Sequence, residues 1–212
     1  MVFATIVFVM VSYKEDALRK LMNRQVQLVD EHDAEIGVTD VVTAHLGDGL
    51  LHRAISVFLF RIDNGVVELL MQRRSTEKLV GAEQWANTVC GNVEPGQSYL
   101  ECAKKRLAYE LDIHDVENLT DVYTLIYQTK CSDLYSENEV DHIFTGWYFG
   151  TAAPNEKEVS AVQWVPWTEV SDAVNLDASF APWFTLMSSD RALRQRITNW
   201  LRLEQSSSVR KN

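Results

Sequence analysis

Cysteine is scarce in this 212-residue sequence, and basic residues are outnumbered by acidic ones. Three cysteines, an odd number, do not make up a disulfide framework, so we expect a reducing, cytoplasmic compartment. The 20 Lys and Arg residues against 30 Asp and Glu give a net charge of −10. Because such a chain repels phosphate backbones and anionic lipids, nucleic acid and membrane surfaces are not expected as partners. A phosphate-bearing small molecule still fits a local basic cluster or a bound metal.

The sequence also lacks an apolar run long enough to cross a membrane. Met1–Tyr13 is apolar and uncharged, but a membrane-spanning helix takes about 20 such residues. The segment has neither the basic start nor the clear cleavage site of a signal peptide. It could be an extra strand, an interfacial or disordered leader, or the product of a start codon assigned too early, with Met22 as the true start. We favour the last two and treat residues 1–24 as an N-terminal extension.

No internal repeat and no linker divides the chain, so we expect one domain over residues 25–203 and a polar tail over residues 204–212. A hydrophobic content of 46% is enough for a sizeable core. Strands and helices are interleaved but hairpins dominate, which predicts an α+β fold. Strands are expected at Gln25–Asp30, Ala54–Phe60, Val66–Gln72, Val122–Gln128, His142–Gly150 and Val162–Val165, loops at Asp30–Gly37 and Pro154–Glu158, and helices at Lys14–Arg24, Trp167–Val174 (capped by Thr168) and Ala192–Leu203.

We expect the functional site to be organised around residues 85–113. Their pattern predicts a short strand, a turn at Cys90-Gly91, and a helix that begins at Ser98, where Glu101 completes a capping-box motif. A thiol would then lie just before a helix N-terminus, whose free N–H groups suit phosphate.

Two histidines and two carboxylates could hold a metal ion. His45 and His52 lie seven residues apart before the first buried strand, and Glu137 and Glu139 share a face if their segment is extended. A lone histidine is more often structural, and the acidic pair could equally be a solvated loop. Adjacent carboxylates repel unless a cation or proton separates them. Together the four side chains form a nitrogen and oxygen ligand set for a borderline or hard divalent ion.

A basic cluster stands out in this acidic chain. Arg73 and Arg74 end the expected hairpin strand, and Lys78 follows four residues later. Such clusters are usually solvated edges, but this one leads into the Cys90 segment and could bind a diphosphate. Trp183 is most simply a core residue, although an aromatic face can also stabilise a cationic intermediate.

Taken together, these segments resemble type I isopentenyl-diphosphate isomerase, a Nudix-fold enzyme. The resemblance covers Gln25 to Met187, and five segments occur in the family's order. Five ordered segments are far more specific than any single motif. The segments are Leu50–Phe60, Gln72–Ser75, Asn87–Gly91, Glu137–Val140 and Ala181–Phe184.

The resemblance implies a Nudix-type mixed β-sheet sandwiched by helices. It also implies an isomerase that interconverts isopentenyl diphosphate and dimethylallyl diphosphate by protonation and deprotonation. In that family the residues at the positions of Cys90 and Glu139 face each other across the substrate and move protons on and off its carbons. Tyr127 would assist Glu139, and the face of Trp183 would lie over the tertiary carbocation. We expect an isoprenyl diphosphate as the small-molecule partner, and a monomer or homodimer.

The resemblance further implies two metal requirements. Glu110 would bind a Mg²⁺ that bridges the diphosphate, and Arg74 and Lys78 would contact the phosphates. Asn92 stands where the family has a third histidine, and its amide oxygen is a weaker ligand than imidazole for a transition ion. The family's lysine before the first metal histidine is also absent, with Val41 nearest. The residues expected to hold a divalent metal (Mg²⁺, Mn²⁺ or Zn²⁺) are His45, His52, Glu137 and Glu139.

Two other functions remain as alternatives. A Nudix hydrolase needs several carboxylates in the pattern Arg-Glu-x-x-Glu-Glu, but the stretch Lys105–Glu110 keeps only the last one, and Gln97 replaces an upstream Glu. Hydrolysis is therefore disfavoured. A homologue that binds an isoprenoid diphosphate without turnover would account for Asn92, but it would have no chemical reason to keep Cys90, Tyr127 and Glu139.

Overall fold

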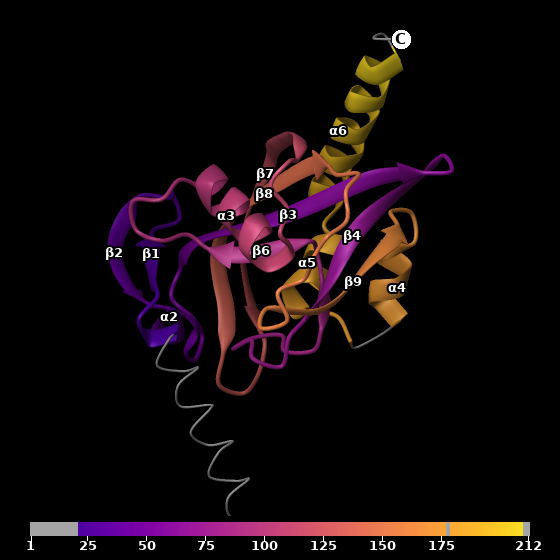
Figure 1. The fold of residues 1–212 in the computed structure, drawn as a ribbon. Coiled ribbons are helices and arrows are strands. Elements are labelled where there is room, and N and C mark those ends of the chain that lie inside the picture. The colour runs from indigo at the N-terminus through magenta and orange to yellow at the C-terminus, as the bar shows by residue number, and fades with distance from the viewer. Residues whose placement is uncertain (1–20, 177–178, 210–212) are drawn as a thin grey trace, which may run out of the picture.

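A nine-stranded mixed β-sheet forms the centre of the computed structural model, in which residues 21–176 and 179–209 are described (Figure 1). Met1–Tyr13 and most of the expected helix Lys14–Arg24 lie outside the described residues. Each expected strand is found, with shifted boundaries. The strands are β1 (Gln25–Val29), β2 (Glu35–Asp40), β3 (His52–Asp63), β4 (Val66–Arg74), β5 (Trp85–Ala86), β6 (Val89–Asn92), β7 (Glu117–Lys130), β8 (Ser136–Trp147) and β9 (Val159–Pro166).

Strand β3 connects the sheet because it pairs with four other strands. It runs parallel to β8, in a register that begins with His52 opposite Glu139, and antiparallel to β1, β4 and β6. Strand β7 extends the sheet beyond β8, while β5 and β9 pair with β4. The predicted hairpin between β3 and β4 is confirmed. Its turn residues Asn64 and Gly65 have positive φ angles of 47° and 82°, as a tight two-residue turn requires.

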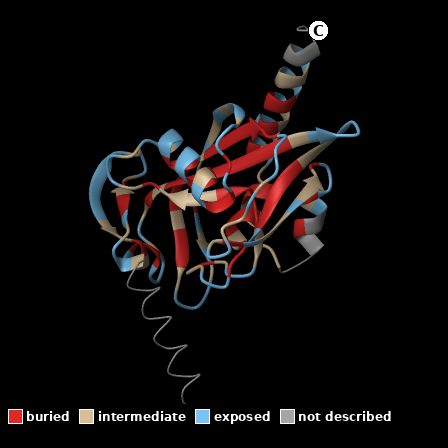
Figure 2. Cartoon of the chain, viewed as in Figure 1, coloured by how far each residue is buried: buried red, intermediate tan, exposed pale blue. Residues whose placement is uncertain are grey.

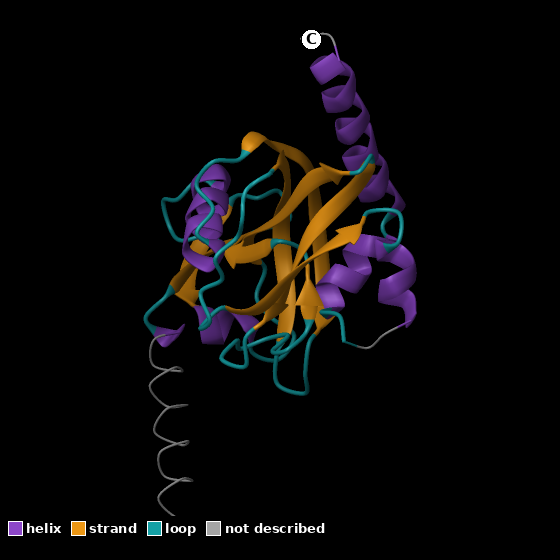
Figure 3. Cartoon of the chain, turned by 45° about the vertical axis from the view of Figure 1, so that its right-hand side comes forward, coloured by secondary structure: helices purple, strands orange, loops and turns teal. Residues whose placement is uncertain are grey.

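Helices cover both faces of the sheet (Figures 1 and 3). Helix α3 packs against one face, and α4, α5 and α6 pack against the other. The predicted start of α3 is confirmed. The Ser98 side chain accepts a bond from the Glu101 N–H, and the Glu101 carboxylate accepts one from the Ser98 N–H at 2.9 Å. The helices are α2 (Val41–His45), α3 (Tyr99–Leu111), α4 (Val170–Leu176), α5 (Pro182–Ser189) and α6 (Arg191–Val209).

The alternation of side chains along β3 separates two hydrophobic cores. Phe58 and Phe60 belong to the core beneath α4, α5 and α6, whereas Val57 and Leu59 belong to the core beneath α3. Buried residues are concentrated in the central strands (Figure 2). Ser56 lies on the same face of β3 as Phe58 and Phe60, because side chains two residues apart in a strand point the same way. Its polar side chain is therefore buried at the edge of the first core.

Four local predictions are wrong. Strand β2 begins at Glu35, within the segment expected to be a loop; it is a largely exposed edge strand, so no apolar alternation marks it. Cys90 and Gly91 do not form a turn but lie within β6, paired with β3. Helix α4 begins after the turn that contains Thr168, so this residue is not its cap. Helix α6 continues past Leu203, where we expected the terminal helix to end.

The α+β class is confirmed, with helices on both faces of a mixed sheet. None of the helices in residues 21–176 and 179–209 combines the length and the apolar character that crossing a membrane requires. The sheet face beneath α4, α5 and α6 is the one that carries the polar residues selected from the sequence, so the site is built there.

Candidate active site

Four neighbouring strands bring the selected side chains together. His52 of β3 lies opposite Glu139 of β8, and Glu139 lies opposite Tyr127 of β7. Cys90 of β6 lies opposite Ser56 of β3. Residues directly opposite one another in a sheet share a face. These side chains therefore project together at the polar end of the core beneath α5.

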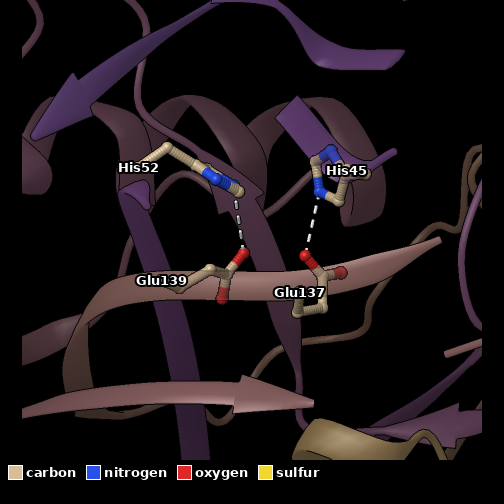
Figure 4. A group of neighbouring side chains, drawn as sticks. All are labelled: His45, His52, Glu137 and Glu139. Carbon is tan, nitrogen blue, oxygen red and sulfur yellow. Dashed lines mark ion pairs between the residues drawn. The ribbon is translucent and has the colours of Figure 1, made fainter. Parts of the chain in front are cut away.

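A buried cluster joins two histidines to two carboxylates (Figure 4). His45 comes from the end of α2 and His52 from the start of β3, and they meet Glu137 and Glu139 of β8. One ligand atom from each side chain lies within 4.8 Å of the other three. His45 Nε2 is 2.9 Å from Glu137 Oε2, and His52 Nε2 is 3.6 Å from Glu139 Oε1. The structure thus brings together the four residues that we expected to hold a divalent metal.

Backbone carbonyls orient both imidazole rings. His45 Nδ1 lies 2.6 Å from the Val41 carbonyl oxygen, and His52 Nδ1 lies 2.7 Å from that of Leu50. Because a carbonyl only accepts hydrogen bonds, each Nδ1 carries the proton and each Nε2 faces the carboxylates. The buried His52 Nε2 has no hydrogen-bond partner. An unpartnered buried imidazole nitrogen, in a set of nitrogen and oxygen ligands, fits a divalent cation.

Without a metal ion, the charges of the cluster depend on which of its histidines and carboxyl groups are protonated. Burial opposes a charge on His45, but the facing Glu137 carboxylate outweighs burial and raises the pKa of His45 to about 9. Burial also opposes a charge on Glu137, yet His45 lowers the pKa of this carboxyl to about 2. Burial and the charge of Glu137 together raise the pKa of Glu139. A bound cation would let both carboxylates ionise.

Cys90 lies in a network of hydrogen bonds next to this cluster. Its thiol donates to Asn87 Oδ1 at 3.1 Å, and the Ser56 hydroxyl oxygen lies 3.9 Å from its sulfur. Ser56 also donates to the buried Asp141 carboxylate at 2.8 Å. Burial raises the pKa of the Cys90 thiol to about 12, so it keeps its proton at neutral pH. We did not predict Asp141, although its period-two spacing from Glu139 places it on the same face.

A cavity of about 80 Å³ is lined by the four side chains expected to act in catalysis. They are Cys90, Glu139, Tyr127, whose hydroxyl donates a hydrogen bond to Glu139, and Trp183 near the start of α5. Trp183 also belongs to the core, which confirms the simpler interpretation of this residue, while its role over a cationic intermediate stays a prediction. Asn92, which lies on the same face of β6 as Cys90, lines this cavity as well.

Arg74 and Arg73 differ in their surroundings. Arg74 lines the small cavity, and its guanidinium carbon lies 4.9 Å from the centre of the Trp183 ring. Two of its N–H groups donate to the Val80 carbonyl, at 3.1 and 3.0 Å, so the guanidinium is held in place. Arg73 is exposed and pairs with Glu83 instead. The structure therefore brings only Arg74 to the site.

A second cavity, of about 380 Å³, is lined by basic side chains that include Lys78 and Arg106. The fully buried Glu110 of α3 accepts a bond from Arg106 Nε at 2.8 Å and lies 3.8 Å from Lys78 Nζ. Glu158, before β9, pairs with both cations. Glu110 is thus surrounded by cations and is not part of the four-residue His/Glu cluster. Its Oε2 atom is buried without a hydrogen-bond partner.

Arg106 is the main charged residue of the site that we did not predict. Its spacing of four from Glu110 on one helix was the available signal. Gly91 leaves room for it, because a Cβ at Gly91 would lie 2.7 Å from Arg106 Cγ. At the start of α3, where we expected N–H groups suited to phosphate, the capping box already engages the N–H groups of Ser98 and Glu101.

Gly81 supports the wall of the small cavity. A Cβ there would lie 2.6 Å from Trp183 Cη2, and its φ of +60° disfavours side chains. Gly81→Ala should therefore displace Trp183 and destabilise the fold by about 1–3 kcal/mol from the clash, beyond about 1–2 kcal/mol of backbone strain. The matched control is Gly47→Ala, at a φ of +63° with nothing within 4 Å. Equal losses of stability in the two variants, measured by urea unfolding, would contradict this contact.

The ion pairs of Glu158 predict a pH dependence of stability. Burial opposes its charge, but Lys78 and Arg106 lower the pKa of Glu158 from 4.5 to about 2. Because the pKa of Glu158 is lower in the folded than in the unfolded protein, its ionised form adds to the free energy of unfolding. This stabilisation is complete above pH 4.5 and is lost as the pH falls through 2. Glu158→Gln should therefore be less stable than the parent at pH 7, by a difference that shrinks between pH 4.5 and 2. The control is Glu156→Gln, an exposed neighbour, and identical pH profiles for both variants would contradict the prediction.

Comparisons with known proteins agree with this geometry. The family model of the NUDIX domain matches residues 50–184. Over 178 residues the chain is 33% identical to isopentenyl-diphosphate Delta-isomerase 2 of Aromatoleum aromaticum, covering 84% of this chain and 91% of that protein. Over 176 residues it is 35% identical to the isopentenyl-diphosphate Delta-isomerase of Nocardia farcinica, covering 80% of this chain and 97% of that protein.

A solved structure supports the fold alone. DR0079 from Deinococcus radiodurans matches with a TM-score of 0.64 at 17% identity, covering 78% of this chain and 97% of that chain. With the NUDIX match, this confirms the Nudix-type mixed sheet that the sequence implied. The chain therefore belongs to the NUDIX domain family and, within it, to the isopentenyl-diphosphate Delta-isomerases.

Proposed function

We propose that this protein interconverts isopentenyl diphosphate and dimethylallyl diphosphate. The observation that carries the proposal is the shared cavity of Cys90 and Glu139, a thiol and a carboxyl beside a buried His/Glu cluster. Moving a double bond by one carbon needs one group that gives a proton and another that accepts one. The similarity to isomerases over most of the chain supports the same reaction.

The proton transfers balance between these two groups. One of Cys90 and Glu139 gives its proton to the terminal alkene carbon, where a C–H bond forms and the double-bond electrons are consumed. The adjacent tertiary carbon becomes cationic, opposite the face of Trp183. The other group then takes a proton from the neighbouring methylene, whose C–H electrons form the new double bond. In the reverse reaction the two groups exchange roles, and the Tyr127 hydroxyl supports Glu139 through its hydrogen bond.

The His/Glu cluster would hold a divalent metal, Mg²⁺, Mn²⁺ or Zn²⁺, through His45, His52, Glu137 and Glu139. When bound, the metal would supply positive charge that lowers the proton affinity of Glu139. The carbonyl bonds of His45 and His52 fix their Nε2 atoms toward this ion in advance.

The diphosphate would occupy the cation-lined space beside the cluster. Lys78 and Arg74 supply charge-assisted hydrogen bonds to its oxygens. Glu110 would bind a Mg²⁺ bridging the diphosphate, and its unpartnered Oε2 fits this role. Arg106, which we did not predict, donates a hydrogen bond to Glu110 and lines the same space.

Hydrolysis remains a disfavoured alternative. Helix α3 has only two acidic residues, Glu101 and Glu110, and Glu101 is engaged in the capping box. A set of carboxylates that could hold several Mg²⁺ ions around an attacking water is therefore missing from this helix. Binding without turnover is the other alternative, and the experiments below separate the three.

The same proposal extends to the cellular setting. All three cysteines are free, which suits a reducing cytoplasm, and we propose this compartment for the protein. We further propose that it acts as a monomer or homodimer, because a single chain supplies every side chain named in the reaction.

Replacing the thiol tests the proposal. Cys90→Ala should lower the rate of dimethylallyl diphosphate formation by roughly 10²–10⁴-fold, because it removes one partner of the proton transfer. Binding of the substrate should remain that of the parent, since the thiol does not hold the diphosphate, and a cooperative urea transition should show that the variant still folds. The matched control is Cys131→Ala, a free cysteine that does not line the small cavity. Comparable activity in both variants would refute the role of Cys90.

Restoring the third histidine tests the metal site. Asn92→His should tighten binding of a divalent metal by at least about tenfold. Mutating a residue that only hydrogen-bonds to a metal ligand already changes metal affinity by roughly 10- to 100-fold, and an added imidazole would be a ligand itself. Isothermal titration with Zn²⁺ and Mn²⁺ measures this change. The control is Gln163→His, which adds an imidazole at an exposed position of β9. Equal affinity in Asn92→His and the parent would mean that Asn92 does not face the ion.

A further inference from the structure

The strongest unexplained feature lies where the two cavities meet. Six residues line both the small cavity and the larger one, and three of these are the cations Arg24, Lys78 and Arg106. A substrate whose hydrocarbon contacts Cys90 must place its charged end at this junction. Lys78 and Arg106 are partly neutralised there by Glu110 and Glu158. The role of Arg24 is not explained by the fold.

Arg24 is half-buried and has no ionic partner in the described part of the chain. Arg53, Arg61 and Arg106 each form an ion pair, whereas no carboxylate of residues 21–176 or 179–209 pairs with Arg24. Burial and the nearby charge of Arg106 lower the pKa of Arg24, while the charges of Glu158, Glu94 and Glu110 act against this shift without forming an ion pair with Arg24. Arg24, Lys78 and Arg106 line the same junction, so an anion bound there would offset the cost of holding these cations close together.

The charge of the larger cavity indicates the kind of ligand. Five basic and three acidic side chains line it, a net charge of +2 within a chain whose net charge is −10. Its volume of about 380 Å³ falls within the range of roughly 300–1,000 Å³ that ligand pockets occupy. A small polyanion fits this space better than a neutral or cationic molecule.

The backbone holds Arg24 next to the start of α2. The Val41 N–H donates to the Arg24 carbonyl at 3.0 Å, so the two residues are neighbours although they are distant in sequence. Val41 lines the small cavity but is apolar, so it brings no charge to this corner. Arg24 can therefore bring a cation to the same corner of the site from the adjacent segment.

We propose that Arg24 is a further diphosphate-binding residue, which supplies to the phosphates the positive charge that Val41 lacks. The proposal rests on the proposed function, since it places the hydrocarbon of the substrate against Cys90. An arginine is suited to this role because its planar guanidinium donates two parallel hydrogen bonds to a phosphate.

Titration with inorganic pyrophosphate in the presence of Mg²⁺ tests the proposal on the full chain. Arg24→Gln should weaken binding by about 10- to 100-fold, because a charge-assisted hydrogen bond is lost, and Arg24→Lys should recover part of the loss. With isopentenyl diphosphate, the KM of Arg24→Gln should rise while kcat stays within about threefold. The control for net charge is Arg202→Gln, exposed on α6, which should bind pyrophosphate like the parent.

A second measurement needs no variant. Phenylglyoxal modifies accessible arginines, and mass spectrometry should show that pyrophosphate protects Arg24 but not Arg202. Unchanged pyrophosphate affinity in Arg24→Gln, or equal modification of Arg24 with and without pyrophosphate, would overturn the proposal. Failure of the proposed function would look different. In that case the parent protein would bind pyrophosphate but would form no dimethylallyl diphosphate.

Discussion

The parallel pairing of β3 with β8 is the constraint on which the rest of the site depends. Its register places His52 beside Glu139, and side-chain alternation then puts Glu137, Glu139 and Asp141 on one face. A slip of one residue would turn all three carboxylates to the opposite face, toward the core beneath α3. The apolar residues of the same strands, such as Phe60 and Phe58, resist this slip because they would leave their own core.

The site separates two kinds of charge that match the two ends of its proposed substrate. Buried carboxylates gather with histidines at one end, where they repel each other unless a cation or a proton separates them. Lysine and arginine gather at the other end, where Glu110 and Glu158 balance them only in part. Between these regions lie Cys90, Tyr127 and Trp183, which line a cavity of about 80 Å³. A molecule with a small hydrocarbon and a diphosphate complements all three regions at once.

Much of this site could be predicted from local sequence. The period-two spacing of Glu137 and Glu139 and the cap at Ser98 are local patterns, and the structure has both. His45 and His52 stood out because they precede the first buried strand, but no spacing rule connects them to β8, and the resemblance to a known family joined them to Glu137 and Glu139. Because the chain belongs to that family, such a resemblance could identify residues that come together only in the folded protein.

The remainder depends on contacts between distant segments. Strand β2 forms because β1 offers it a partner, and Gly91 lies in a strand because β6 pairs with β3. The bond from Ser56 to Asp141 joins strands that are far apart in sequence. Arg24 shows the same limit, since only the fold reveals that its carbonyl lies beside Val41. These pairings join residues that are far apart in sequence, so they cannot be predicted from the pattern of any short segment.

The isomerisation is tested most directly by incubating the purified protein with isopentenyl diphosphate and Mg²⁺ in D₂O and following the substrate by NMR. Dimethylallyl diphosphate should form, and deuterium should enter the carbons that gain and lose protons, because the two transfers draw on exchangeable groups. Release of inorganic phosphate or pyrophosphate without isomerisation would contradict it in favour of hydrolysis. Substrate that stays bound but unlabelled would contradict it in favour of a protein that binds its ligand without converting it.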